Sequence, residues 1–428
     1  MSSEATKGIS VDIDQNQYLA EGVDTVDAIV TVQVGADFSA PAPVQERLEI
    51  IIIDCSGSMA AGDRFAGARE ATLAALDEMA EGTLFALVKG THEGEVIFPA
   101  RGPLRRKDPE SVFAARHALD TLRPYGGTAM GSWLGVARQV AGQYPQAMAH
   151  TILLTDGKNE HEEPAHLDEE IRLSQGKFTC DCRGVGGGDM VKELRTIASG
   201  LLGGYDVIKT GSELVADFRA MMQVSMGRAI PDLTLRVWNP AGATVRFVKQ
   251  VAPNIEDLTG RRTETGAQVG EYSLGAWGAE DRDYHVQVRV DPAAPGREKL
   301  AARISVVAGD EVIGQGLVKA TWTTDSELSA RISRRVAHYT GQAELAQAVQ
   351  EGLAARKEGD LDTATAKLQR AVELAAESGN EGTAKLLRNV VEVDDHTGTV
   401  RLRRNVDTFD EMALDARSTK TARVRKES

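Results

Sequence analysis

Cysteines, long apolar runs and a leader segment are all scarce or missing, and each absence argues against a class of protein. The 428 residues include only three cysteines, Cys55, Cys180 and Cys182, too few for a secreted scaffold held together by disulfides. No run of about eighteen apolar residues occurs, so we predict no transmembrane helix. The first eight residues lack the apolar core of a secretory signal peptide. We therefore expect a cytoplasmic protein without a membrane span.

Positive charge is scarce as well. Lys and Arg total 49 against 63 Asp and Glu, which gives a formal net charge of −14. A surface that binds nucleic acid needs clustered positive charge, so we expect no nucleic acid as the main partner. Acidity of this kind chiefly favours solubility. The chain is also too long for one ordinary hydrophobic core, and we expect two or three domains.

The most informative segment is a short apolar run that ends in an aspartate, Ile51-Ile52-Ile53-Asp54, followed by Ser56 and Ser58. Buried parallel strands are continuous β-branched runs, and ligands of open α/β sheets bind where such strands end. One carboxylate and two hydroxyls at that point suit a hard divalent cation such as Mg²⁺. The serines could also cap the following helix, a role that is compatible with cation binding.

Two later segments repeat this chemistry. Gly126-Gly127-Thr128 is a glycine-marked turn before a helical pattern over residues 129–143, and a second apolar strand, residues 151–155, ends at Asp156. Taken in order, Asp-x-Ser-x-Ser, Gly-Gly-Thr and strand-Thr-Asp-Gly resemble the metal-ion-dependent adhesion site of von Willebrand factor A (vWA) domains. The individual motifs are weak, but three in the right order are specific.

The resemblance assigns metal positions to five residues: Asp54, Ser56, Ser58, Thr128 and Asp156. In that family the serines and either the Thr or the Asp bind the ion directly, and the others act through water. The cation is Mg²⁺, or Mn²⁺ or Ca²⁺, and its sixth position is left open for an acidic group of a partner. The family topology also suggests Arg64, Trp133 and His92 as residues at the rim of the site.

The pattern of elements predicts an α/β fold with several parts. Residues 46–228 alternate strand and helix, which predicts a Rossmann-like vWA domain with a mostly parallel sheet and helices on both faces. Residues 229–324 alternate apolar and polar positions, as in an antiparallel β-sandwich. The few strands of residues 8–45 would be marginal alone. We expect them to join the sandwich, with the vWA domain as an insertion between its strands.

The carboxyl-terminal third is expected to be helical and then irregular. Residues 325–398 contain two amphipathic helices around Glu358-Gly359-Asp360, which resemble one tetratricopeptide hairpin. A single repeat leaves its apolar face uncovered, so we favour a helical bundle packed on the sandwich over a peptide-binding groove. Residues 399–428 are basic, and we expect a disordered tail. The alternatives are an arm for an acidic partner or a phosphorylation segment at Ser418, Thr419 and Thr421.

Two further clusters allow more than one interpretation. Cys180 and Cys182 alternate in a predicted strand, either as a metal-binding pair or as ordinary buried residues without other Cys or His ligands nearby. Just after the second metal strand stand two histidines and four acids: His161, His166, Glu160, Glu162, Glu163 and Asp168. They could form a second metal site, but acids at a helix start are usually solvated and favour the helix dipole. The cluster could also select the acidic group of the partner.

These features predict a non-enzymatic binding and scaffolding protein. The alternative is a hydrolase or phosphatase with Asp54 as nucleophile, but such phosphatases use an acid two residues on, where this chain has Ser56. A Gly-x-Ser-x-Gly nucleophile motif is also missing. Bacterial intracellular members of the family work with AAA+ ATPases as co-chaperones of metal insertion or complex assembly. Others work with kinases, phosphatases or forkhead-associated proteins in stress response and signalling.

Overall fold

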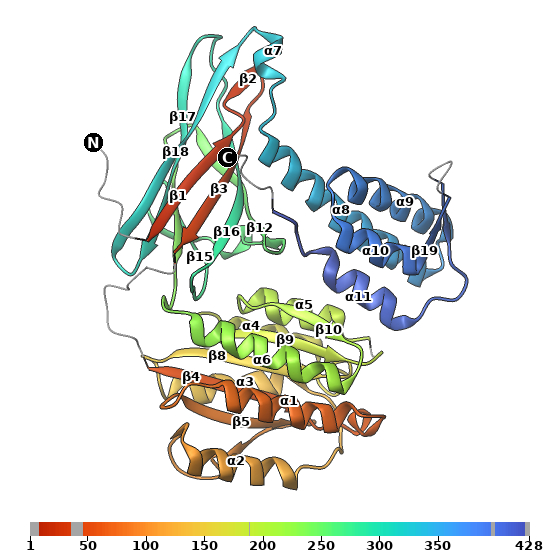
Figure 1. Ribbon diagram of the computed structural model, residues 1–428. Coiled ribbons are helices and arrows are strands. Elements are labelled where there is room, and N and C mark those ends of the chain that lie inside the picture. Colours follow the sequence, from red (N-terminus) through yellow and green to blue (C-terminus); the bar gives the residue numbers. More distant parts are fainter. Residues whose placement is uncertain (1–7, 36–45, 188, 395–398, 424–428) are drawn as a thin grey trace. The chain divides into compact units, whose positions relative to one another are not determined.

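The computed structural model describes residues 8–35, 46–187, 189–394 and 399–423 (Figure 1). The chain divides into two compact units, one of residues 40–231 and one that combines residues 1–39 with 232–428. Within the described ranges, the structure contains no helix that is both long and apolar enough to cross a membrane.

The unit of residues 40–231 is built on a seven-stranded sheet. Its strands are β4 (Arg47–Asp54), β5 (Leu84–Gly90), β6 (Gly94–Phe98), β7 (Arg105–Arg106), β8 (Met148–Thr155), β9 (Thr179–Val185) and β10 (Tyr205–Ile208). The order is β10-β9-β8-β4-β5-β6, with β7 paired to β5. Strands β10, β9, β8, β4 and β5 are parallel, and β6 and β7 run antiparallel to β5.

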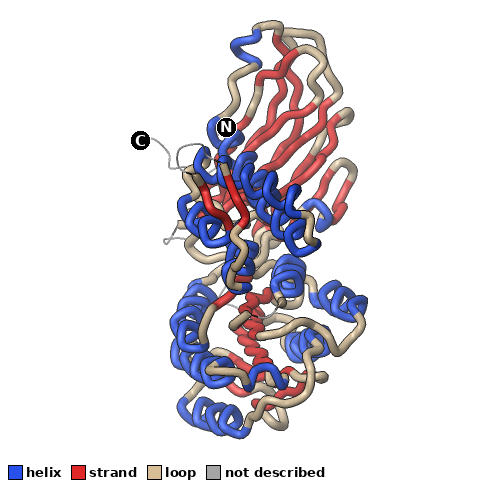
Figure 2. The backbone as a smooth tube through the Cα atoms, turned by 90° about the vertical axis from the view of Figure 1, so that its right-hand side faces the viewer, coloured by secondary structure: helices blue, strands red, loops and turns tan. Residues whose placement is uncertain are grey.

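Helices lie on both sides of this sheet (Figure 2). They are α1 (Arg64–Glu78), α2 (Pro109–Thr121), α3 (Met130–Gly142), α4 (Pro164–Ser174), α5 (Val191–Gly200) and α6 (Gly211–Gly227), with a short 3₁₀ helix η1 (Gly57–Ala60) after β4. The predicted alternation of strand and helix and the mostly parallel sheet are confirmed. Because β4 and β8 are adjacent and parallel, the loops that follow them meet at one edge of the sheet.

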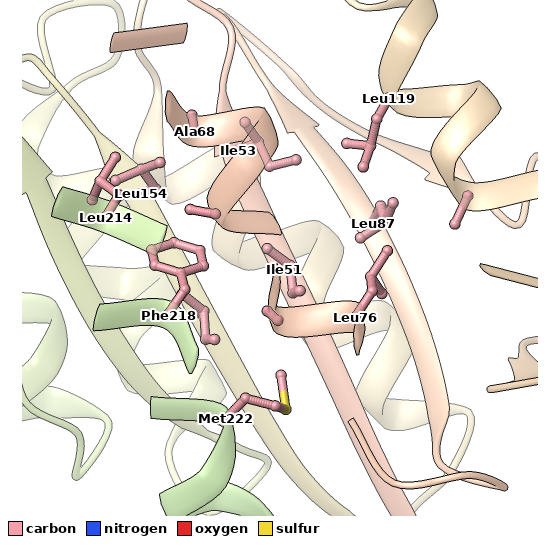
Figure 3. Packing of buried hydrophobic residues seen from close by; sticks show 14 of the residues in the cluster. Ile51, Ile53, Ala68, Leu76, Leu87, Leu119, Leu154, Leu214, Phe218 and Met222 are labelled. Atoms are coloured by element: carbon pink, nitrogen blue, oxygen red, sulfur yellow. The ribbon is translucent and has the colours of Figure 1, made fainter. Parts of the chain in front are cut away.

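The core of this unit explains why β4 reads as an unbroken apolar run. Ile51 and Ile53 point toward α1 and α6 and are almost fully buried there (Figure 3). Helices α1 and α6 approach closely at two glycines, since a Cβ on Gly67 would lie 2.2 Å from the Cα of Gly211. This contact fixes the first turn of α1, and with it Arg64, relative to the start of α6.

A buried polar network closes the opposite end of the same strands. His150 of β8 lies between two carboxylates, 2.7 Å from Glu49 Oε2 on β4 and 2.8 Å from Asp181 Oδ2 on β9. Ser225 of α6 donates to the other Glu49 oxygen at 2.6 Å, and the Arg228 guanidinium lies 3.9 Å from Asp181. Burial disfavours the imidazolium, but the two carboxylates outweigh it and raise the pKa of His150 to about 9.

This network should make the stability of the unit depend on pH. A pKa raised from about 6.5 to about 9 stabilises the folded state by about 3 kcal/mol below pH 6.5, and that contribution is lost as the pH rises through 9. Urea unfolding between pH 6 and 9.5 should therefore show a steeper loss of stability for wild type than for His150→Gln. The matched control is His117→Gln, an exposed position on α2. Parallel pH profiles for wild type and His150→Gln would contradict this assignment.

The second unit contains a two-sheet antiparallel sandwich. Its strands are β1 (Ile9–Gln15), β2 (Tyr18–Ala20), β3 (Thr25–Val34), β11 (Thr234–Trp238), β12 (Ala243–Ala252), β13 (Glu256–Asp257), β14 (Thr263–Gly266), β15 (Val269–Ser273), β16 (Asp281–Val290), β17 (Glu298–Ala308) and β18 (Glu311–Thr323). A 3₁₀ turn, η2 (Thr259–Arg261), follows β13. The sheet orders are β1-β3-β16-β12-β13 and β14-β15-β11-β17-β18-β2.

The amino-terminal strands are part of this sandwich. Strand β3 pairs antiparallel with β16 over nine residue pairs, from Thr25 with Arg289 to Gln33 with Asp281. Strand β2 pairs with the end of β18, the one parallel pairing among the described strands of the sandwich. The parallel-sheet unit is therefore inserted in the chain between β3 and β11, and the predicted fold class is confirmed.

The rest of this unit is helical. It comprises α7 (Ser326–Ser329), α8 (Arg334–Glu358), α9 (Leu361–Glu377), α10 (Glu381–Val390) and α11 (Thr408–Ser418), with a two-stranded ribbon of β19 (Val391–Val393) and β20 (Val400–Leu402). Helices α8 to α11 share one core, to which Leu345, Leu368, Leu387 and Leu414 contribute one side chain each. Gly359 in the left-handed region, φ +84°, ends α8 and turns the chain into α9.

The prediction of a disordered tail is wrong for residues 399–423, and residues 424–428 lie outside the described ranges. Asp407 caps α11 by accepting the Phe409 backbone N–H at 3.0 Å, and Met412 and Leu414 are buried. The basic composition of the tail concealed this short apolar face. Ser418 and Thr419, two of the three residues considered for phosphorylation, are buried too.

One buried carboxylate joins the carboxyl-terminal segment to the sandwich, in addition to backbone contacts such as Thr421 N–H to Pro253 O at 3.0 Å. Asp283 of β16 accepts hydrogen bonds from Thr31 at 2.6 Å and Tyr339 at 2.5 Å, and it forms ion pairs with Arg335 at 3.1 Å and Arg423 at 3.0 Å. Burial acts against its charge, but these donors outweigh burial and lower the pKa of Asp283. Asp283 thus joins β3, β16, α8 and the end of the chain.

Removing the charge of Asp283 should be costly because two arginines lose their buried partner. Asp283→Asn should lower the free energy of unfolding by about 3 kcal/mol, as expected when one member of a buried ion pair is removed. The control is Asp281→Asn two residues earlier, which also contacts Arg423 but is partly exposed and should cost at most about 1 kcal/mol. If urea unfolding showed the same loss of free energy of unfolding for both variants, burial of Asp283 would not explain its contribution to stability.

Candidate metal site

Asp54 ends β4 and is held by two neutral donors. Its Oδ1 accepts the Ser56 backbone N–H at 2.6 Å, and its Oδ2 accepts the Thr155 hydroxyl at 2.5 Å. Thr155 is a further candidate site residue that the sequence analysis did not assign, although a hydroxyl directly before the strand-end aspartate is visible in the sequence. By clamping Asp54 across the β4–β8 pair, Thr155 fixes the direction of its carboxylate.

The two serines and Asp156 form a chain of oxygen atoms. Ser56 Oγ lies 3.0 Å from Ser58 Oγ, and Ser58 Oγ donates to Asp156 Oδ1 at 2.7 Å. The Ser56 hydroxyl is thus directed at Ser58, whereas a capping role would have directed it at the backbone of η1. The structure therefore brings Asp54, Ser56, Ser58 and Asp156 together at the edge predicted from the strand ends.

Thr128 reaches the same place on the loop before α3. The loop is tied to the first motif because the Gly57 N–H donates to Gly126 O at 3.0 Å. A Cβ built on Gly157 would lie 3.7 Å from Ser58 Oγ and 3.8 Å from Thr128 Oγ1, so these two hydroxyls lie beside the same backbone position. Gly127 is required here, since a Cβ would meet the His161 ring at 2.2 Å.

The segment after β8 caps the amino end of α3. The His161 ring Nδ1 accepts the Thr128 N–H at 3.0 Å, and Asn159 Oδ1 accepts the Met130 N–H at 2.7 Å. Glu162 accepts the N–H groups of Gly131 at 2.6 Å and Ser132 at 3.1 Å. Across the described residues, no group of three or more His, Cys, Asp or Glu is arranged to hold a metal. Of these residues, His161 holds Thr128 directly, and Asn159 and Glu162 hold the first turn of α3 that follows it.

The cysteine pair is an ordinary part of the core. Cys180 and Cys182 are both fully buried, with their sulfurs 3.8 Å apart. Burial raises the pKa of the Cys180 thiol, which keeps it protonated and unreactive. In the described chain these cysteines are free thiols.

A pocket of about 430 Å³ opens above the site. It is lined by Ser56, Ser58, Gly126, Gly127, Thr128, Gly157, Lys158, Glu160, His161 and Asp189. Lys158 and Asp189 form an ion pair of 2.7 Å at its wall. Of the three rim candidates, Arg64 bonds Asp156 at 2.6 Å and His92 lies exposed beside Gly126. The expectation for Trp133 is wrong, because its ring is fully buried and its N–H donates to Thr91 O at 2.6 Å.

The electrostatics of the site favour a cation. Burial raises the pKa of Asp54 to about 6; the nearby Asp156 adds to the shift, and the hydrogen bonds from Thr155 and Ser56 oppose it. In the part of the chain that the structure describes, Asp54 lacks an ion-pair partner, and Asp156 has one, Arg64. A buried charge without a counter-ion is costly, so a divalent cation bound to these oxygens would relieve that cost. The donor set fits such an ion, since hydroxyl and carboxylate oxygens are the ligands of Mg²⁺ and Ca²⁺.

Fold and site together define a domain of the von Willebrand factor A class. The family description "von Willebrand factor type A domain" matches residues 50–158, and "von Willebrand factor type A C-terminal domain" matches residues 373–418. The solved von Willebrand factor type A protein from Catenulispora acidiphila is 48% identical, covers 99% of both chains and superposes with a TM-score of 0.93. The chain belongs to the von Willebrand factor type A family.

Two more distant proteins are also similar to this chain. The ArnB paralog VWA2 from Sulfolobus acidocaldarius is 12% identical, with 96% of this chain and 98% of that chain covered and a TM-score of 0.62. The uncharacterized protein sll0103 of Synechocystis sp. is 26% identical over 275 residues, and the match spans 62% of this chain and 62% of that relative. Domains of this family are generally non-catalytic modules that bind protein partners.

The capping role of Glu162 can be separated from simple surface charge. Glu162→Ala should lower the free energy of unfolding by about 1–2 kcal/mol, because two N–H groups at the start of α3 lose their acceptor. Its neighbour provides the control: Glu163 is exposed, and Glu163→Ala should change stability by at most about 0.5 kcal/mol. Thermal unfolding of both variants checks this, and similar melting temperatures would contradict the capping role.

Proposed function

We propose that this protein binds a divalent cation through Asp54, Ser56, Ser58, Thr128 and Asp156 and uses it to hold a Glu or Asp of a partner protein. The observation that carries the proposal is the buried Asp54 carboxylate, which meets only neutral donors among the described residues while two serine hydroxyls stand beside it. Mg²⁺ is the cation we favour, with Mn²⁺ and Ca²⁺ as alternatives.

Each ligand has a distinct task in this proposal. The hydroxyls of Ser56, Ser58 and Thr128 present lone pairs to the cation, and the carboxylates supply the charge that a hard cation requires. Thr155 restrains Asp54 by its 2.5 Å hydrogen bond, as outer hydrogen bonds commonly orient metal ligands. The pocket above the serines leaves room for a side chain from outside to complete the coordination.

The chemistry of the pocket supports an acidic partner group. A cation with an open position attracts a carboxylate, and Lys158 at the wall can favour the same charge. Glu160 and Asp189 carry the opposite sign and would repel acidic groups that miss the cation. Recognition therefore depends on one well-placed carboxylate rather than on a generally acidic surface.

The biological setting is proposed from the family resemblance alone. A bacterial stress-response, signalling or complex-assembly system is the setting we propose, with kinases, phosphatases, forkhead-associated proteins or AAA+ ATPases as candidate partners. In one version of this proposal the partner is an AAA+ ATPase, and the protein acts as its co-chaperone in metal insertion. A phosphatase that uses Asp54 as nucleophile is disfavoured because Ser56 stands where the general acid would be required.

Asp54→Asn should abolish cation binding while preserving the fold. The amide keeps the shape of the side chain but removes the charge, and we expect Mn²⁺ affinity, measured by isothermal titration calorimetry, to fall by at least about a hundredfold. Without cation, the variant should unfold at the same or a higher temperature than wild type, because a buried uncompensated charge has been removed. Asp63→Asn is the matched control, since Asp63 is an exposed aspartate just before α1.

The partner is tested with the same pair of variants. Wild type, Asp54→Asn and Asp63→Asn are each used to retain proteins from a native lysate in Mg²⁺ and in EDTA, with identification by mass spectrometry. A protein retained by wild type and Asp63→Asn only in Mg²⁺, and lost with Asp54→Asn, supports the proposal. Retention that is independent of both Asp54 and cation contradicts it, and turnover of a phosphoester that requires Asp54 would favour the phosphatase.

A further inference from the structure

Within the described residues, Asp54 and Asp156 together have one ion-pair partner, which is Arg64 on Asp156. Its Nη1 lies 2.6 Å from Asp156 Oδ2. The Asp156 side chain is fully buried, while the Arg64 side chain is 27% exposed. A positive charge thus already lies on a carboxylate assigned to the divalent cation.

The position of Arg64 is built into the fold. Arg64 is the first residue of α1, and the close contact between Gly67 and Gly211 fixes that end of the helix against α6. On its other side the guanidinium packs on the β9–α5 loop, where a Cβ at Gly186 would lie 2.7 Å from Arg64 Nε. Glycine at position 186, with φ +80°, therefore leaves the space in which the guanidinium reaches Asp156.

The two oxygens of Asp156 are both occupied by chain donors. Oδ1 accepts from Ser58 and Oδ2 from Arg64. A divalent cation would draw on the charge of Asp156, directly or through a water molecule, and would therefore compete with Arg64 for that carboxylate. The Ser58 hydroxyl can keep donating to Oδ1, because donation uses its O–H and leaves its lone pairs for the cation. The cation would also place two positive groups on one carboxylate, and like charges at that separation repel.

We propose that Arg64 is the internal counter-ion of the site: it neutralises Asp156 in the cation-free protein and is displaced toward solvent when the divalent cation enters. The proposal rests on the proposed function. Because Arg64 stabilises the empty site, it weakens cation binding and raises the concentration at which the site fills. A long side chain that is already partly exposed can leave Asp156 by rotating its own bonds, without moving α1.

Calorimetric titration of the full chain with Mn²⁺ tests the proposal on four proteins: wild type, Arg64→Gln, Arg64→Lys and Arg69→Gln. Arg64→Gln removes the charge, and we expect its affinity for Mn²⁺ to rise about fivefold, as for the loss of a competing, partly exposed ion pair. Arg64→Lys keeps a cation and should remain near wild type. Arg69→Gln is the control, because Arg69 on the same helix pairs with Asp120, which is exposed.

Thermal unfolding gives a second, independent readout. In EDTA, Arg64→Gln should melt below wild type because Asp156 has lost its counter-ion, and saturating Mn²⁺ should close that gap. Unchanged or weaker Mn²⁺ binding by Arg64→Gln, while wild type binds, would overturn this inference alone, since Arg64 would then stay on Asp156 in the loaded site. Absence of Mn²⁺ binding in wild type and in every variant would overturn the proposed function together with the inference.

Discussion

Two carboxylates are buried where neighbouring parallel strands end, and this constraint organises the whole candidate site. Asp54 and Asp156 stand at the ends of β4 and β8, both almost inaccessible to solvent. Asp54 is held by a backbone N–H and a threonine hydroxyl, and Asp156 by a serine hydroxyl and one guanidinium. Neutral donors orient a carboxylate but do not neutralise its charge. The negative charge of the two carboxylates is therefore only partly compensated by the protein, which favours binding of a cation.

At the other end of the same strands, the buried carboxylates are neutralised by a side chain of the protein itself. There, Glu49 and Asp181 hold His150 between them, and the hydroxyl of Ser225 takes the remaining oxygen of Glu49. The protein thus supplies its own buried cation at the amino ends of the strands. At the carboxyl ends it supplies a pocket lined by hydroxyls and an arginine whose side chain is partly exposed. One end of the sheet therefore holds the fold together, and the other is where we propose that a cation binds.

The sequence was informative wherever short-range pattern decides the structure. The ends of two apolar strands indicated Asp54 and Asp156, and the resemblance to vWA domains added Thr128 of the Gly-Gly-Thr turn. The contacts that place them come from distant positions: Thr155 on Asp54, His161 on Thr128, and Arg64 on Asp156. Such partners depend on the packing of several elements and are invisible to spacing.

The carboxyl-terminal region shows the opposite failure, in which composition misled. Averaged over residues 399–428, basic charge outweighed the few apolar residues, yet α11 buries Met412 and Leu414 beneath an Asp407 cap. The first of the two helices expected around Glu358-Gly359-Asp360 is long: α8 runs over Arg334–Glu358. Its first turns pack Val336 and Tyr339 against the sandwich, and that contact is long-range.

The central claim is that a divalent cation belongs among the oxygens of Asp54, Ser56, Ser58, Thr128 and Asp156. Its most direct test is anomalous diffraction from crystals of the full chain grown with Mn²⁺. The account predicts one strong anomalous peak at ligand distance from the Ser56 and Ser58 hydroxyls, with an oxygen from solvent or a neighbouring carboxylate completing the coordination. Well-ordered crystals without a peak there, or with the peak at other residues, would contradict it.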